Sequence, residues 1–115
     1  MEIINVKKFD VDKIAKQVFD ESINLLGGLR KIMEYKNLTW LPSLAEASYV
    51  IVLKNESLLT SREIAEELGL SIQTVNNILR AEEINEVNIN ELKEVSSHKA
   101  GSIVKLAYKR IKMRK

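Results

Sequence analysis

The sequence predicts a mainly α, single-domain protein over residues 1–115, and three observations support this expectation. Apolar residues recur every three or four positions along most of the chain, which is the spacing of one face of an α-helix. Glycine and proline, with four and one copies, rarely interrupt that pattern. No linker, low-complexity tract or repeat divides the chain, and a domain of this length can bury about two-thirds of its unfolded surface.

Residues 1–40 are expected to form an N-terminal helical region. A short extended segment or strand is expected at residues 3–6, before a helix capped by Asp10 or Asp12. Gly27-Gly28 interrupts the pattern, so we expect a break there and a second helix that ends near residue 36. The positions at helical spacing are Val11, Ile14, Ala15, Val18, Ser22, Leu25, Leu26, Leu29, Ile32 and Met33. Because they exceed the needs of one small core, residues 11–36 are the expected dimer or partner surface.

Residues 41–80 are expected to form a core of three helices. Pro42 suits a first helical turn, and the following helix, residues 44–54, should be buried on two sides, with Trp40 packing at its start. Thr60 and Glu63 have the spacing of a capping box for the second helix. Gly69 allows a tight turn, and Ser71 caps the third helix.

The third helix of this core has one apolar and one polar face. The residues expected to be buried are Ile72, Val75, Ile78 and Leu79. The residues expected to point outward are Gln73, Thr74, Asn76, Asn77 and Arg80. A polar face of amides with a single cation indicates a surface that makes hydrogen bonds.

These residues resemble the helix-turn-helix DNA-binding family, and the helix that begins near Leu44 resembles the first helix of its tri-helical, sigma-factor-like or LuxR-like form. The matching core, small and turn positions are Ile64, Ala65, Leu68, Gly69, Leu70, Val75 and Ile78. The resemblance implies that residues 71–80 form a recognition helix in the major groove of double-stranded DNA. Glutamine and asparagine amides can pair with adenine, Ser71 and Thr74 can reach phosphates, and Arg80 can bind guanine or a phosphate.

A second resemblance spans more of the chain. Leu41-Pro42-Ser43, residues 60–65, residues 98–101 and residues 105–108 are similar to a small probable regulatory domain that accompanies KaiC-like ATPases. This resemblance implies a regulatory or signalling role with an ATPase partner. The alternative function is therefore an adaptor that docks on such a protein and does not bind DNA.

Residues 81–115 form an acidic connector followed by a basic C-terminal helix. The net charge of the chain is only +2, but residues 99–115 carry seven basic and no acidic side chains. Within the connector, Val87 and Ile89 alternate with asparagines, which is typical of a short strand or wing that could pair with residues 3–6. Asn90 could equally cap a helical turn over residues 91–95.

The C-terminal helix is expected to begin with Ser96 or Ser97 as its cap. Its apolar positions at helical spacing are Ala100, Ile103, Val104, Ala107 and Ile111. Lys105, Lys109 and Lys112 lie on the other face and are the expected phosphate contacts, with a solvated helix face as the alternative. If about four cations of this tail reached phosphates, the logarithmic salt slope of DNA binding would be roughly −3.6.

The sequence does not favour an enzyme. It contains no cysteine, and His98 is its single histidine, so we expect neither a metal site nor a cofactor. No apolar run approaches the roughly 18 residues of a membrane span, and the N-terminus does not resemble a secretion signal, so a cytoplasmic location is expected. The expected function is a sequence-specific, DNA-binding transcriptional regulator that acts as a homodimer, because two half-sites compensate for a recognition helix with one cation.

Overall fold

The computed structural model describes residues 2–35, 38–90 and 97–114, and it is mainly α as predicted. The helices, in chain order, are α1 (Glu2–Leu25), α2 (Leu29–Ile32), α3 (Leu41–Glu56), α4 (Ser61–Leu68), α5 (Ile72–Leu79), α6 (Glu86–Asn90) and α7 (Ser97–Met113). None of the described residues belongs to a strand.

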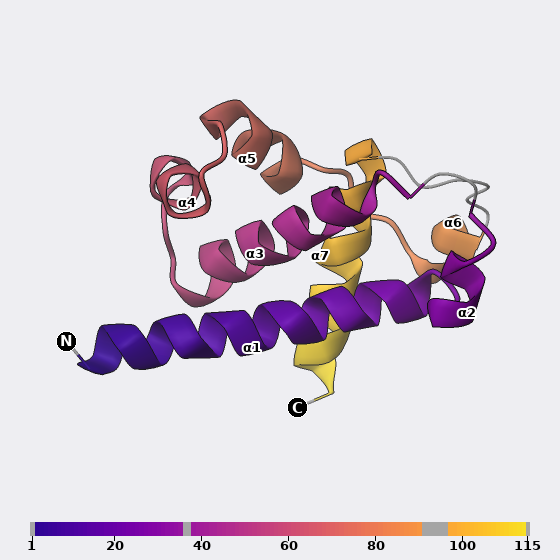
Figure 1. Ribbon diagram of the computed structural model, residues 1–115, viewed down its shortest axis with the longest axis horizontal. Helices are drawn as coiled ribbons and strands as arrows, with labels where there is room; N and C mark the ends of the chain where they lie inside the picture. The colour runs from indigo at the N-terminus through magenta and orange to yellow at the C-terminus, as the bar shows by residue number, and fades with distance from the viewer. Residues whose placement is uncertain (1, 36–37, 91–96, 115) are drawn as a thin grey trace.

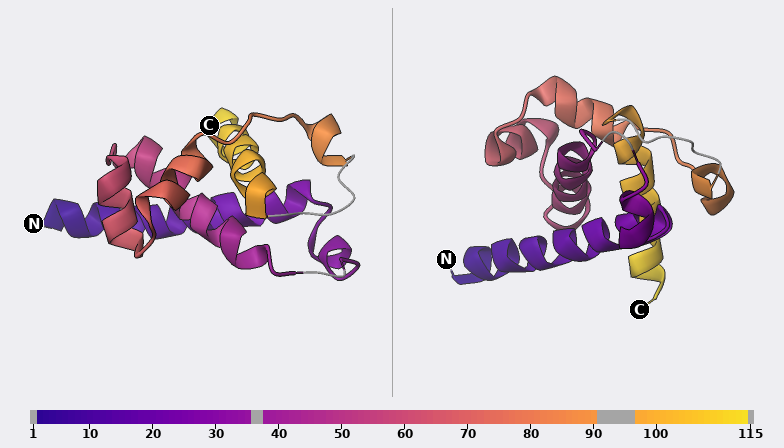
Figure 2. Two further views of the ribbon diagram at one scale, coloured as in Figure 1. Left: turned by 90° about the horizontal axis from the view of Figure 1, so that it is seen from above. Right: turned by 45° about the vertical axis from the view of Figure 1, so that its right-hand side comes forward.

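The three long helices α1, α3 and α7 pack against one another in every pairing and enclose the core. α3 lies between α1 on one side and α4 and α5 on the other, while α7 crosses α1 at a steep angle (Figures 1 and 2). The apolar segment from Val50 to Leu53 is buried throughout, as are Leu44 and Ala47. The prediction that this helix is buried on two sides is therefore confirmed.

α4 and α5 form the predicted pair of short helices joined by a tight turn. The capping box is present: Glu63 N donates to Thr60 Oγ1 over 3.2 Å, and Thr60 N donates to Glu63 Oε1 over 2.9 Å. Gly69 ends α4 in the left-handed conformation, with φ of 70°, which a residue with a Cβ adopts only under strain. Ser71 caps α5 by accepting a hydrogen bond from Thr74 N over 3.0 Å.

The buried face of α5 differs from the prediction at one position. Val75 is fully buried, and Ile78 and Leu79 are half-buried. Ile72 is 39% exposed, so the expectation that it is buried was wrong. Ile72 is the first residue of α5, and no preceding helical turn shields it.

The N-terminal predictions need two corrections. Residues 3–6 lie inside α1, so the expected extended segment is wrong, and neither Asp10 nor Asp12 is an N-cap. A short apolar run fits a strand and a helix equally well, and here it continues the period of the helix that follows. Asp12 has a different role, because its Oδ1 accepts a hydrogen bond from the Tyr49 hydroxyl over 2.9 Å and so ties α1 to α3.

The break at Gly27-Gly28 is confirmed, with φ of 111° and 91° at the two residues. The helix after it, α2, ends at Ile32 rather than near residue 36. Of its predicted apolar positions, Leu29 and Met33 are 78% and 83% exposed. Trp40 is 1% exposed and packs edge-on against Tyr35, which confirms its packing role.

The connector contains a helix where a strand or wing was predicted. Val87 and Ile89 lie in α6, so the strand and its pairing with residues 3–6 are both wrong. Asn85 and Asn88 explain the helix: each backbone N–H donates to the side-chain oxygen of the other, over 3.1 and 3.0 Å, which caps the turn. The alternative helical turn at residues 91–95 lies outside the described residues.

α7 buries the predicted stripe, Ala100, Ile103, Val104, Ala107 and Ile111. The helix begins at Ser97, while Ser96 lies outside the described residues. Gly101 sits where α7 meets the end of α5: a Cβ there would come within 2.8 Å of the Ala81 Cβ and 3.1 Å of the Ile78 carbonyl oxygen. The glycine therefore permits a close approach that fixes α5 against α7.

Candidate nucleic-acid interface

Three polar side chains, two on the solvent-facing side of α5 and one on its C-cap residue Arg80, form one stripe. Gln73, Asn77 and Arg80 are exposed and follow one another at four- and three-residue intervals, so they share a helix face. No hydrogen bond or ion pair to another described residue occupies any of these side chains. Two amides and one guanidinium are thus free to bind groups outside the chain.

The other predicted residues of α5 already have partners. Ser71 Oγ donates to Thr74 Oγ1 over 2.8 Å, and the same Ser71 oxygen caps the helix. Ser61 Oγ donates to Asn76 Oδ1 over 2.7 Å, which joins the start of α4 to the middle of α5. Asn76 therefore ties α5 to α4, whereas Ser71 and Thr74 cap the start of α5.

Three charged residues that were not among the predicted site residues lie beside this stripe. Lys99, near the start of α7, and the acidic Glu82 line one shallow hollow together with Asn77 and Arg80. Glu46, on α3, lines a neighbouring hollow together with Thr74 and Asn77. Lys99 was counted in the basic tail but lies six residues before the lysines chosen from it, and Glu46 carried no sequence signal at all. The local charge around α5 is therefore mixed.

Lys105 holds the end of α5. Its Nζ donates to the carbonyl oxygens of Leu79 and Ala81 over 2.6 and 2.7 Å. The last carbonyls of a helix have no partners within the helix and carry partial negative charge, so an ammonium group is well suited to them. These contacts favour a structural role for Lys105 over a phosphate contact.

Three more cations, two in α7 and Arg114 directly after it, are engaged within the chain. Lys112 Nζ lies 2.7 Å from Glu56 Oε2 and 5.7 Å from the centre of the Tyr108 ring. Arg110 pairs with both Glu21 and Glu86, at 3.2 and 2.7 Å. Arg114 pairs with Glu21 at 2.9 Å. Three of the seven cations of residues 99–115 therefore pair with acidic side chains of the same chain.

The cations of α7 also differ in how close they lie to the stripe. The N-terminal half of α7 meets the end of α5, and the C-terminal end of α7 lies beyond α1 (Figure 1). Lys109 is exposed, and within the described residues it has no charged partner. Of the three lysines predicted as phosphate contacts, the structure brings none into the stripe of Gln73, Asn77 and Arg80.

The environment of Tyr108 belongs to the same charged cluster. Its hydroxyl donates a hydrogen bond to Glu56 Oε2, the oxygen that also pairs with Lys112. Burial raises the pKa of the Tyr108 phenol well above its usual value, and the hydrogen bond and negative charge of Glu56 raise it further. Burial, followed by the hydrogen bond and charge of Asp12, raises the pKa of Tyr49 as well.

No metal-binding or membrane-spanning feature accompanies this surface. In the described ranges, no three His, Asp or Glu side chains are grouped so that they could hold a metal ion. No described helix combines the length and apolar character that crossing a bilayer requires.

Residues 51–81 match the winged helix-turn-helix DNA-binding family. The match begins within α3 and runs through α4 and α5, which is the segment that carries the exposed stripe. It supports a helix-turn-helix of the kind found in DNA-binding regulators, but not the sigma-factor-like or LuxR-like form or the KaiC-associated domain in particular. No curated protein and no solved structure matches the chain.

Proposed function

We propose that the chain is a sequence-specific transcriptional regulator that inserts α5 into the major groove of double-stranded DNA. The observation that carries the proposal is the stripe of Gln73, Asn77 and Arg80, on the second helix of the helix-turn-helix and its C-cap. These side chains are exposed and have no partners among the described residues. Amide side chains can donate to and accept from adenine, and a guanidinium can bind guanine in a bidentate manner. The family match at residues 51–81 supports the same role.

The phosphate contacts are proposed to come from the neighbourhood of α5. Lys99 lies with Arg80 around one hollow, and Ser71 and Thr74 stand at the N-terminal end of the helix. Lys105 is bound to the carbonyls of Leu79 and Ala81, and Lys112 is paired with Glu56. These contacts argue against a role for the two lysines in DNA binding. Lys109 remains a candidate only for DNA that extends past α7.

Fewer available cations change the expected salt dependence. With about two phosphate contacts per chain, the logarithmic slope of affinity against salt is roughly −1.8, and for two chains on two half-sites it is roughly −3.6. A single helix with so few cations binds weakly, so we propose that the protein binds as a homodimer. The exposed apolar residues Leu29 and Met33, in the region predicted as the dimer surface, suit such a contact.

A second candidate function is an adaptor that docks on a protein such as a KaiC-like ATPase. The internal pairing of Arg110, Lys112 and Arg114 favours it, because these cations are then structural. Fluorescence anisotropy with a random duplex at low and moderate salt separates the two. A measurable slope supports DNA binding, whereas no binding at low salt supports the adaptor. Neither candidate involves catalysis or a cofactor.

A further inference from the structure

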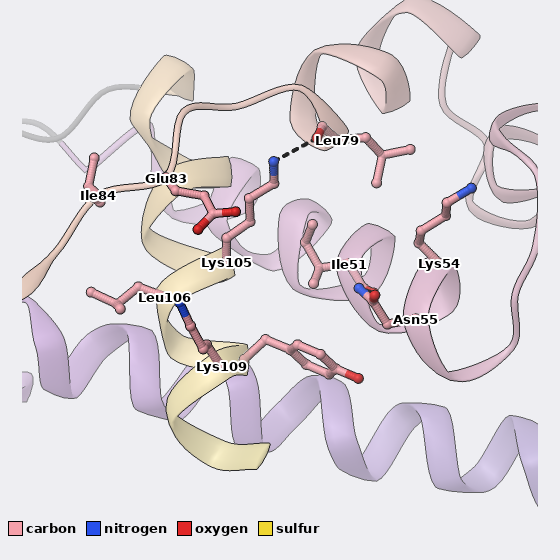
Figure 3. A pocket seen from close by; sticks show the side chains of 10 residues that line it. Ile51, Lys54, Asn55, Leu79, Glu83, Ile84, Lys105, Leu106 and Lys109 are labelled. Carbon is pink, nitrogen blue, oxygen red and sulfur yellow. Dashed lines mark hydrogen bonds between the residues drawn. The ribbon is translucent and has the colours of Figure 1, made fainter. Parts of the chain in front are cut away.

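A third hollow lies beside the end of α5. It has a volume of about 400 Å³ and is formed by α3, the end of α5, the segment that follows α5, and α7 (Figure 3). Small-molecule sites in proteins typically start at about 300 Å³, so this hollow can hold a compact organic molecule.

The lining combines an apolar floor with a basic wall. Ile51 is 3% exposed, and Leu79, Ile84 and Leu106 are half-buried around it. The charged residues of the lining are three lysines, Lys54, Lys105 and Lys109, and one acidic residue, Glu83. The hollow therefore offers an apolar surface next to excess positive charge.

The lysines have donors to spare. Lys54 and Lys109 are exposed, and no hydrogen bond or salt bridge joins them to another described residue. Lys105 uses two of its three N–H groups on the carbonyls of Leu79 and Ala81. Glu83 likewise forms no salt bridge within the described part of the chain, so it leaves these ammonium groups uncompensated.

We propose that this hollow binds a small amphipathic carboxylate. The carboxylate would accept hydrogen bonds from the lysines, and the apolar part would cover Ile51, Leu79 and Leu106. Charge selects an anion over a neutral molecule or a cation, and the floor selects an apolar body over a free inorganic anion. This site is separate from the proposed DNA-binding stripe and does not depend on it.

The test uses octanoate as the probe, with octanol and octylammonium as neutral and cationic counterparts. Titration into ¹⁵N-labelled protein should give saturable shifts of the amides of Leu79 and Leu106 with octanoate. Octanol should bind at least about tenfold more weakly, because it loses roughly one charged hydrogen bond. Because Lys105 bonds the end of α5, the Ala81 amide should shift as well. Equal affinity for octanoate and octanol, or no saturable shift at millimolar octanoate, overturns the proposal.

Variants test the sign of the charge effect. Lys54→Ala and Lys109→Ala should each weaken octanoate binding several-fold, and Glu83→Gln should strengthen it, because it removes the one negative charge in the lining. Lys13→Ala, an exposed lysine of α1 outside the hollow, is the matched control and should change nothing. All four positions are exposed, so the variants should fold, and their free spectra verify this. An unchanged affinity in Glu83→Gln and both lysine variants contradicts the proposed site.

Discussion

Lys105 Nζ, on α7, donates a hydrogen bond of 2.6 Å to the carbonyl oxygen of Leu79, the last residue of α5. A second bond, to Ala81, continues the contact past the helix end. The basic helix thus supports the proposed recognition helix from inside the protein. Two of the three N–H groups of Lys105 are used at the end of α5.

Lys105→Met should lower the free energy of unfolding by about 1.5–3 kcal/mol, the range for a hydrogen bond to a charged group. The methionine keeps the apolar stem but leaves two carbonyls at the end of α5 without their donor. Urea unfolding measures the change. Lys109→Met, on the exposed surface of the same helix, is the control and should stay within about 0.5 kcal/mol. Equal effects would mean that the Lys105 contact does not stabilise the fold.

Gly101→Ala should destabilise the protein even though alanine is the better helix former. On an open helix surface this change stabilises by about 1 kcal/mol. Here the new Cβ would lie 2.8 Å from the Ala81 Cβ, and overpacking of this kind costs about 1–3 kcal/mol. Thermal unfolding gives the sign. A stabilised variant would show that α7 and α5 do not pack as closely as described.

Glu21 connects α1 to the end of α7. Replacing it should lower the free energy of unfolding more than replacing a neighbouring acidic residue. Glu21 is 5% exposed and pairs with Arg110 and Arg114. The arginines are partly exposed and can regain water, so we expect Glu21→Gln to cost about 1–2 kcal/mol, less than the 3–5 of a fully buried pair. Asp20→Asn, which breaks an exposed pair with Lys16, should cost less than about 0.5 kcal/mol. Urea unfolding of both variants makes the comparison, and equal losses would contradict it.

The stability of the protein should fall above about pH 10, the ordinary pKa of tyrosine. The folded-state pKa values of Tyr49 and Tyr108 are raised, so at that pH the unfolded chain loses protons that the folded chain keeps. The stabilisation is complete below the unfolded pKa and is lost as the pH rises through the folded one. Unfolding of the wild type and of a Tyr49→Phe, Tyr108→Phe double variant from pH 8 to 11 measures it. The double variant should show a shallower decline; parallel curves would refute this reading.

The fold was predictable where local signals agreed with one another. The capping pair Thr60 and Glu63, the turn at Gly69 and the cap at Ser71 each act within a few residues, and all three are where the sequence predicts them. The strand predictions for residues 3–6 and 86–90 were wrong. A run of four or five residues fits both the period of a strand and that of a helix, so its pattern alone does not distinguish them.

The candidate site was less predictable, because it depends on which distant residues meet. The exposure of Gln73, Asn77 and Arg80 follows from helical spacing, so the sequence could identify them. The partners of the basic tail could not be identified in this way. Glu21 and Glu56 are 89 and 56 residues from Arg110 and Lys112, and only the crossing of α1, α3 and α7 brings these charges together.

The central claim, that the free stripe of α5 reads DNA sequence, is tested most directly by selecting a preferred site from a random duplex library. Affinity for that site and for a scrambled duplex is then measured with wild type, Asn77→Ala and the matched control Asn24→Ala, on the exposed surface of α1. The account predicts that Asn77→Ala reduces the preference for the selected site by about 1–3 kcal/mol, the value of one bidentate base contact, while Asn24→Ala leaves it intact. Failure to enrich any sequence, or an unchanged preference in Asn77→Ala and in equivalent Gln73 and Arg80 variants, would contradict it.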